Sequence, residues 1–84
     1  EISKNKIELT PDINVDSILE QMAKKYADYE VSTIDGVKIM FEKEWVHLRK
    51  SNTEPIIRIY SESRDMESAD RLAKKIMQEI MELK

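Results

Sequence analysis

The sequence predicts an α+β fold, a two-layer sandwich in which two helices cover one face of a four-stranded, mainly antiparallel sheet. Helical hydrophobic spacing occurs near both ends of the chain, and strand-like alternation fills the region between them. The expected order is therefore one helix, four strands and a second helix. Eighty-four residues, 40% hydrophobic and 37% charged, are typical of one small folded domain rather than a disordered chain.

Residues 1–12 precede the first helical pattern and are mostly polar, with Pro11 near their end. They are predicted to form a linker or a short leading strand. We assign residues 13–84 to a single domain. The chain starts at Glu1 rather than at a methionine, so we expect it to be a piece of a longer protein.

The first helix is predicted from Val15 to about Asp28. Asn14 is a suitable N-cap, and Asp16 places a negative charge in the first turn, where the helix dipole favours it. Apolar residues recur at three- and four-residue intervals along one side, at Val15, Ile18, Leu19, Met22 and Tyr26.

The first two strands are predicted as a hairpin around Asp35-Gly36. This dipeptide is typical of a two-residue type I′ turn, because the turn needs positive φ angles that glycine adopts without steric cost. Strand-forming residues lie at alternate positions on both sides, at Val31, Thr33, Val37, Ile39 and Phe41.

The other two strands are predicted at Trp45–Lys50 and Ile56–Ser63, with Lys43-Glu44 as the turn before the first of them. The cluster Ser51–Pro55 between them is rich in turn formers. It also has the Ser-x-x-Glu spacing of a helical capping box, but the branched and aromatic residues that follow favour a strand.

The second helix is predicted from Met66 onward, with Asp65 as its N-cap. Its apolar residues again share one face: Ala69, Leu72, Ala73, Ile76, Met77 and Ile80.

Composition excludes several classes of function. With no cysteine there is no disulfide, no thiolate zinc site and no cysteine nucleophile, and a single histidine argues against a histidine metal cluster. No apolar run reaches the roughly 18 residues that span a bilayer, so no membrane partner is expected. The net charge of −3 argues against a nucleic-acid partner. Lys43–Arg64 nevertheless carries five basic and three acidic residues, a local excess that suits a small anion.

Four polar side chains are candidates for an anion site: Arg49, Ser51, Asn52 and Thr53. They follow one another at the end of a predicted strand and around a tight turn. A guanidinium supplies charge and two parallel donors, while hydroxyls, an amide and backbone N–H groups complete the shell of a phosphate. The alternative is a polar loop whose hydroxyls satisfy its own backbone.

Two neighbouring residues allow more than one interpretation. His47 shares a predicted strand face with Trp45 and Arg49; it could act as an acid or base, but a lone strand histidine is more often structural. Arg58 either flanks the anion site or pairs with a nearby glutamate.

The segment Arg49–Pro55, together with Ile57–Tyr60 and the earlier Asp35-Gly36-Val37 hairpin, resembles the C-terminal domain of the α-D-phosphohexomutases. This family includes phosphoglucomutase, phosphomannomutase and phosphoglucosamine mutase. The resemblance covers nearly the whole chain, from the first helix to the last. Lys50 stands where the family often has proline, and Asn52 where it often has glycine.

The resemblance implies a cytoplasmic isomerase of four domains that interconverts hexose 1-phosphates and hexose 6-phosphates. It transfers phosphate through a phosphoserine in the first domain and a bisphosphorylated intermediate, with Mg²⁺ in the second domain. The fourth domain holds the substrate phosphate, and Arg49, Ser51, Asn52 and Thr53 match its phosphate contacts. The expected partners are the phosphosugar and the other domains of the same chain.

The family's serine, metal and sugar-binding motifs do not occur in this sequence. We therefore expect no catalytic residue, no metal ligand and no cofactor in this piece, and no activity from it alone. The sequence does not discriminate between glucose, mannose and glucosamine phosphates. A stand-alone α+β interaction module without a sugar-phosphate role is the alternative.

Overall fold

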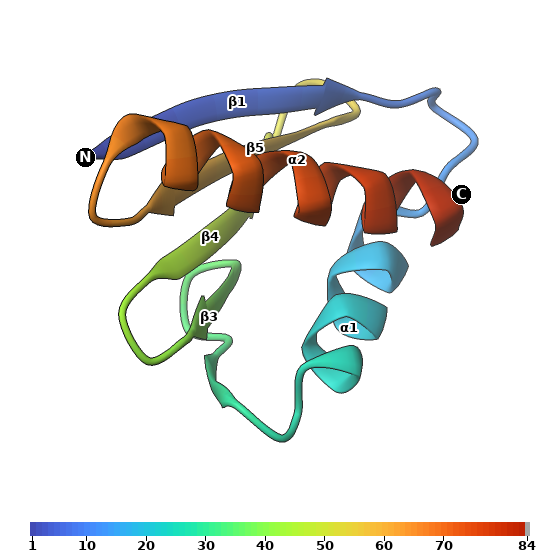
Figure 1. Ribbon diagram of the computed structural model, residues 1–84. Coiled ribbons are helices and arrows are strands. Elements are labelled where there is room, and N and C mark those ends of the chain that lie inside the picture. The colour runs from blue at the N-terminus through green and yellow to red at the C-terminus, as the bar shows by residue number, and fades with distance from the viewer. Residues whose placement is uncertain (84) are drawn as a thin grey trace.

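The computed structural model describes residues 1–83 and has the predicted α+β architecture, with one layer of strands and one of helices (Figure 1). The elements follow one another along the chain as β1 (Ile2–Glu8), α1 (Val15–Lys25), β2 (Glu30–Ser32), β3 (Val37–Met40), β4 (Trp45–Lys50), β5 (Ile56–Glu62) and α2 (Met66–Leu83).

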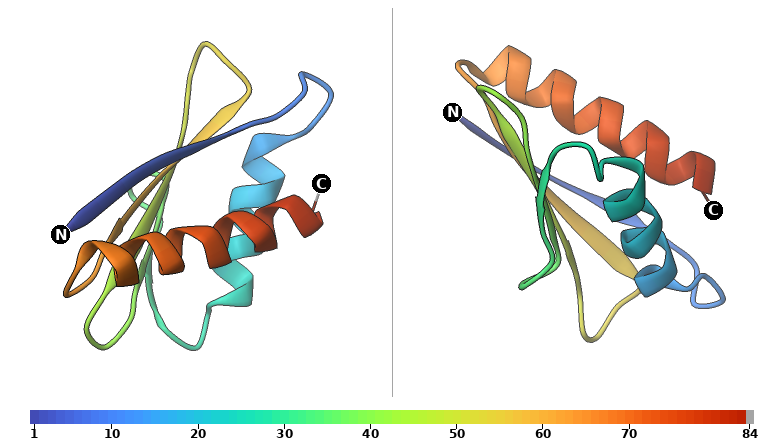
Figure 2. Two further views of the ribbon diagram at one scale, coloured as in Figure 1. Left: turned by 45° about the horizontal axis from the view of Figure 1, so that its top comes forward. Right: turned by 90° about the horizontal axis from the view of Figure 1, so that it is seen from below.

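The five strands form one sheet in the order β1-β5-β4-β3-β2, and every neighbouring pair is antiparallel. Both helices lie on the same face of this sheet (Figure 2). α2 packs on β1 and β5, whereas α1 packs mainly on β3. The face away from the helices, here called the outer face, has no layer of its own covering it within residues 1–83.

The sheet has five strands rather than the predicted four, because residues 2–8, for which a linker or a short leading strand was expected, form β1. This strand pairs with β5 along its whole length, from Ile2 opposite Glu62 to Glu8 opposite Ile56. The hydrophobic alternation of this strand is incomplete, because the polar residues Ser3 and Asn5 occupy inward positions. The Ser3 hydroxyl donates a hydrogen bond to the Asp70 carboxylate of α2.

The predicted hairpin exists, but its turn is not the expected type I′. A type I′ turn requires positive φ at both central residues, and Gly36 is the only residue with positive φ in the described part of the chain, at 78°. Ser32 pairs with Lys38, so the loop has five residues centred on Asp35. Asp35 instead keeps a negative φ, and its carbonyl and carboxylate contact His47 and Arg49 of β4.

The bounds of β4 and the starts of α1 and α2 match the predictions, whereas the second turn and the ends of α1 and β5 differ by one to three residues. The second turn is centred on Glu42-Lys43 rather than Lys43-Glu44, since Phe41 N–H bonds to the Glu44 carbonyl at 2.8 Å. α1 ends at Lys25, three residues before Asp28.

The predicted helix caps are confirmed. The Asn14 side chain accepts a hydrogen bond from Ser17 N–H at 3.0 Å, and the Asp65 carboxylate accepts one from Ser68 N–H at 2.7 Å.

The core lies between the two layers. Its largest fully buried apolar side chains come from the sheet and both helices: Met22, Ile39, Val46, Leu48, Ile57, Ile59, Ile76 and Ile80. Tyr26 joins the helices, because its hydroxyl donates a hydrogen bond to Glu79 of α2 at 2.5 Å. Burial raises the pKa of Tyr26 above its ordinary value.

Within residues 1–83, neither helix has the length and hydrophobicity that crossing a bilayer requires.

Candidate functional site

The loop Ser51–Pro55 joins the ends of two central strands, β4 and β5. Ser51 N–H bonds to the Ile56 carbonyl at 3.2 Å, which closes the loop. Leu9 N–H bonds to the Pro55 carbonyl at 2.7 Å, so the segment after β1 also holds the loop. The loop therefore projects from the centre of the sheet and is held by backbone hydrogen bonds to β5 and to the segment after β1.

The hydroxyls of Ser51 and Thr53 lie together inside this loop, 3.3 Å apart. The Ser51 hydroxyl also accepts hydrogen bonds from the N–H groups of Thr53, at 3.2 Å, and Glu54, at 3.3 Å. These contacts are the self-satisfied arrangement that the sequence left open as the alternative to an anion site. They also gather hydroxyl and N–H donors at one point, as an oxyanion requires.

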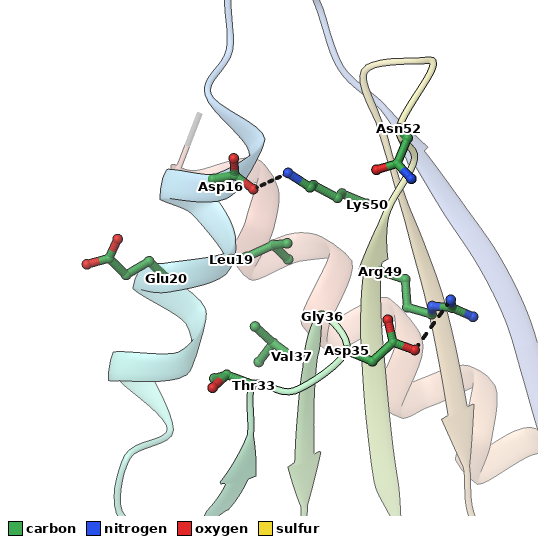
Figure 3. Close-up of a pocket in the computed structure, with 10 residues that line it drawn as sticks. All are labelled: Asp16, Leu19, Glu20, Thr33, Asp35, Gly36, Val37, Arg49, Lys50 and Asn52. Atoms are coloured by element: carbon green, nitrogen blue, oxygen red, sulfur yellow. Dashed lines mark hydrogen bonds and ion pairs between the residues drawn. The ribbon is translucent and has the colours of Figure 1, made fainter.

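Arg49 lies on the outer face just before the loop, and its charge has one carboxylate partner. Its Nη2 is 3.4 Å from Oδ2 of Asp35, which sits on the β2–β3 turn (Figure 3). Both side chains are exposed, at 49% and 69%. Exposed pairs contribute about 0 to 1 kcal/mol, so an incoming dianion can displace Asp35.

His47 holds the same turn from the neighbouring position on β4. Its Nε2–H donates a hydrogen bond to the backbone carbonyl of Asp35. This contact fits the structural role expected for His47 rather than that of an acid or base.

Gly36 allows the turn to approach β4 this closely. A Cβ added at this position would lie 2.2 Å from the backbone oxygen of Leu48 and 3.3 Å from Cα of Arg49. The glycine thus serves both the positive φ of the turn and the contact between Asp35 and Arg49.

Lys50 points to the other side of β4, toward the helices (Figure 3). Its Nζ lies 2.7 Å from Oδ1 of Asp16 in the first turn of α1. Although its side chain is 44% exposed, this ion pair connects the end of β4 to α1.

A cavity of about 470 Å³ lies between α1, the β2–β3 turn and the end of β4. Of the four predicted site residues, Arg49 and Asn52 line it, and Ser51 and Thr53 do not. Its charged lining comprises three carboxylates, Asp16, Glu20 and Asp35, against the two cations Arg49 and Lys50. That balance disfavours a phosphate inside this cavity.

Comparison with known proteins identifies the family. The sequence model of the family described as phosphoglucomutase/phosphomannomutase, C-terminal domain, matches residues 6–79. The chain belongs to this mutase family. The described fold, from β1 to α2, is thus that of the family's C-terminal domain.

Curated relatives of this mutase domain are much longer than the chain. A phosphoglucosamine/phosphogalactosamine mutase from Sulfurisphaera tokodaii is 40% identical over 87% of the chain, which covers 16% of that relative. A phosphoglucomutase/phosphomannomutase from Thermococcus kodakarensis is 54% identical over 49% of the chain and 9% of its own length. A phosphoglucosamine mutase from Methanococcus maripaludis is 37% identical over 64% of the chain and 12% of its own length.

Arg58 is a residue of this mutase domain that sequence reasoning did not place. It lies directly opposite Arg49 in the β4–β5 register, on the outer face. No carboxylate within residues 1–83 forms an ion pair with it, so the pairing with a glutamate is absent there. Only the strand register, which depends on the loop length, could have revealed this juxtaposition.

Metal ligands are not gathered in the described part of the mutase domain. Residues 1–83 contain no group of three or more histidine, cysteine, aspartate or glutamate side chains close enough to hold a metal ion. These residues therefore do not fit the Mg²⁺ that the resemblance implies for the family.

Proposed function

We propose that this chain is the substrate-phosphate-binding domain of a longer phosphohexomutase, which interconverts hexose 1-phosphates and hexose 6-phosphates. Its role is to hold the phosphate group that is not being transferred. The phosphoserine, the Mg²⁺ and the sugar-reading groups would come from other domains of the same polypeptide, in the cytoplasm. The 84-residue chain alone is expected to show no mutase turnover.

Two features support the proposal: the half-exposed guanidinium of Arg49 has only a weakly held carboxylate partner, and the loop that begins two residues later brings the hydroxyls of Ser51 and Thr53 together. In the proposed complex, Arg49 contacts the phosphate oxygens and gives up Asp35. The hydroxyls of Ser51 and Thr53 and the amide of Asn52 complete the shell. Each charge-assisted hydrogen bond contributes about 1.5 to 3 kcal/mol before the costs of desolvation and ordering.

Family membership supports the same role, since relatives of this domain are named as mutases of phosphosugars. Positioning a phosphate assists transfer only when the other reacting group is held nearby. The chain spans at most about a sixth of the relatives named above, so the reacting serine is sought in the rest of the enzyme.

Titration of the ¹⁵N-labelled chain with glucose 1-phosphate tests the proposal. We expect saturable shifts at the amides of Arg49, Ser51, Asn52 and Thr53, with a dissociation constant near the millimolar range, about −4 kcal/mol. Repeating the titration with glucosamine and mannose phosphates would rank the sugars.

Arg49→Ala should abolish the saturable shifts. Arg71→Ala is the matched control, because Arg71 is an exposed arginine on α2 that pairs with a helical neighbour, Glu67, at 3.1 Å. Loop shifts that persist in Arg49→Ala, or that are absent from the wild-type chain at tens of millimolar ligand, would contradict the proposal.

A further inference from the structure

The outer face of the sheet carries its cations in two central rows. Residues directly opposite each other in an antiparallel sheet project from the same face, which places Lys6, Arg58 and Arg49 in one row across β1, β5 and β4. The next row contains Lys4, Tyr60, His47 and Lys38. Neither row contains a carboxylate of a strand residue.

Two like-charged pairs therefore face each other directly, Lys6 with Arg58 and Arg58 with Arg49. Like charges directly opposite each other destabilise a sheet unless an anion lies between them. Arg49 has Asp35 as its partner, and Lys38 lies over the ring of Trp45 at 4.6 Å. The uncompensated charge is thus displaced toward the β1 side of the face.

Three of these cations line one cavity. It has a volume of about 360 Å³ and is formed by Lys4, Asn5, Lys6, Arg58 and Tyr60. In the described part of the chain, neither Lys4 nor Arg58 has an ion-pair partner. Lys6 has only Glu8, at 3.7 Å, with exposures of 57% and 75%, a pair that holds its charge weakly.

We propose that this cavity is a second anion site, distinct from the Ser51–Pro55 loop, that takes a small tetrahedral dianion such as a phosphate monoester. The Arg58 guanidinium supplies paired donors, and the ammonium groups of Lys4 and Lys6 supply charge from the neighbouring strand. The Tyr60 hydroxyl is a further available donor. None of the five lining residues belongs to the cavity beside Arg49.

A small ligand fits the charge pattern better than a nucleic acid does. Carboxylates bound the two cationic rows at both ends of the strands, with Glu8 on one side and Glu30 and Glu62 on the other. A polyanion following the strands would meet these carboxylates, whereas a single dianion stays within the cationic centre.

Lysines on an edge strand have an alternative role, because they hinder pairing with other chains. β1 is such an edge strand, and Lys4 and Lys6 lie on it. Arg58 lies on β5, which is paired on both sides, so edge protection does not account for Arg58.

The test titrates inorganic phosphate into the ¹⁵N-labelled 84-residue chain at constant ionic strength, following the amides of Lys4, Lys6 and Tyr60. We expect saturable shifts there that chloride does not reproduce. Lys4→Gln/Lys6→Gln should weaken this binding about tenfold or more, which corresponds to about 1.4 kcal/mol, while leaving the Ser51–Thr53 shifts unchanged.

The matched control is Lys74→Gln/Lys75→Gln, which removes the same two positive charges from exposed positions of α2 and should leave the binding unaltered. If the β1 double variant aggregates, Arg58→Gln provides the same test without altering the edge strand.

Shifts that chloride reproduces, or that persist in the variants, would overturn the second site. Tight, salt-sensitive binding of a single-stranded RNA oligonucleotide across the whole outer face would overturn it in favour of a nucleic-acid surface. Because Arg49→Ala removes only the loop site, failure of either site can be recognised separately.

Discussion

Asp35 is an internal competitor for the guanidinium that the proposed phosphate needs. Its carboxylate contacts Arg49 at 3.4 Å, and its backbone carbonyl is held by His47. Asp35→Asn keeps the backbone contact and removes the negative charge. We expect phosphate to bind the loop about two- to fivefold more tightly, because an exposed ion pair is worth at most about 1 kcal/mol.

The measurement is the same amide titration with inorganic phosphate, read at Ser51 and Thr53. Asp28→Asn removes an equal charge from the segment between α1 and β2 and should leave the midpoint unchanged. Unchanged or weaker binding in Asp35→Asn would show that Asp35 does not compete with the ligand.

Gly36 is the residue whose replacement should most disturb the turn beside Arg49. A left-handed backbone costs a non-glycine residue about 1 to 2 kcal/mol, and the new Cβ would lie 2.2 Å from the Leu48 oxygen. Gly36→Ala should therefore lower the free energy of unfolding by roughly 2 kcal/mol or more in urea denaturation. Ser32→Ala, at an exposed position of β2, should change it by less than about 0.5 kcal/mol. Equal stabilities of the two variants would mean that the turn moves away from β4 freely.

At the scale of the elements, the start of α2 gives a pH-dependent contribution to stability. Hydrogen bonds from Ser68, first from its backbone N–H and then from its hydroxyl, lower the pKa of Asp65 below its ordinary value of 3.8. Since the folded state favours the carboxylate, this contribution is present above the unfolded pKa and is lost as the pH falls through the lower, folded pKa.

Asp65→Asn keeps an oxygen acceptor at the cap but cannot titrate. We expect the variant to lose less of its thermal midpoint than the wild type between neutral pH and pH values below about 4, measured by circular dichroism. Asp65→Ala should be less stable at neutral pH because the cap is lost. An identical acid loss in wild type and Asp65→Asn would rule out the Asp65 contribution.

Helices and strands with a regular hydrophobic pattern were predicted well from the sequence, and turns were predicted less well. Both helix caps, the outer-face alternation of Trp45, His47 and Arg49, and the last strand follow from periodicity and local chemistry. The strand register around Asp35 could not be predicted in this way, because it depends on how the turn packs against β4, a contact between residues distant in the sequence.

The candidate site divides in the same way. The motif placed Arg49 next to a loop whose Ser51 and Thr53 hydroxyls do meet. The partner of Lys50 on α1 and the position of Arg58 opposite Arg49 depend on tertiary packing and register, which no local pattern encodes.

At the scale of the whole molecule, β1 completes the sheet that supports both proposed anion sites. It covers the free edge of β5, and its end contributes Ile7 and Leu9 to the core, with exposures of 6% and 8%. α2 packs across β1 and β5 together. The segment that the sequence left open as a linker or a short leading strand is therefore part of the only sheet in residues 1–83.

A chain restricted to residues 13–84 should consequently fail to fold cooperatively. Losing β1 removes the hydrogen-bond partner of β5, uncovers part of α2 and leaves Ser61 and its buried neighbours accessible to water. Small domains are stable by only about 5 to 15 kcal/mol, and burying Ile7 and Leu9 alone contributes about 1.5 to 3 kcal/mol each. Circular dichroism and amide spectra of the two chains measure the difference, and adding a peptide of residues 1–12 should restore the folded spectrum. A cooperative transition of 13–84 at the same midpoint as 1–84 would show that β1 is an accessory strand and that the loop is held without it.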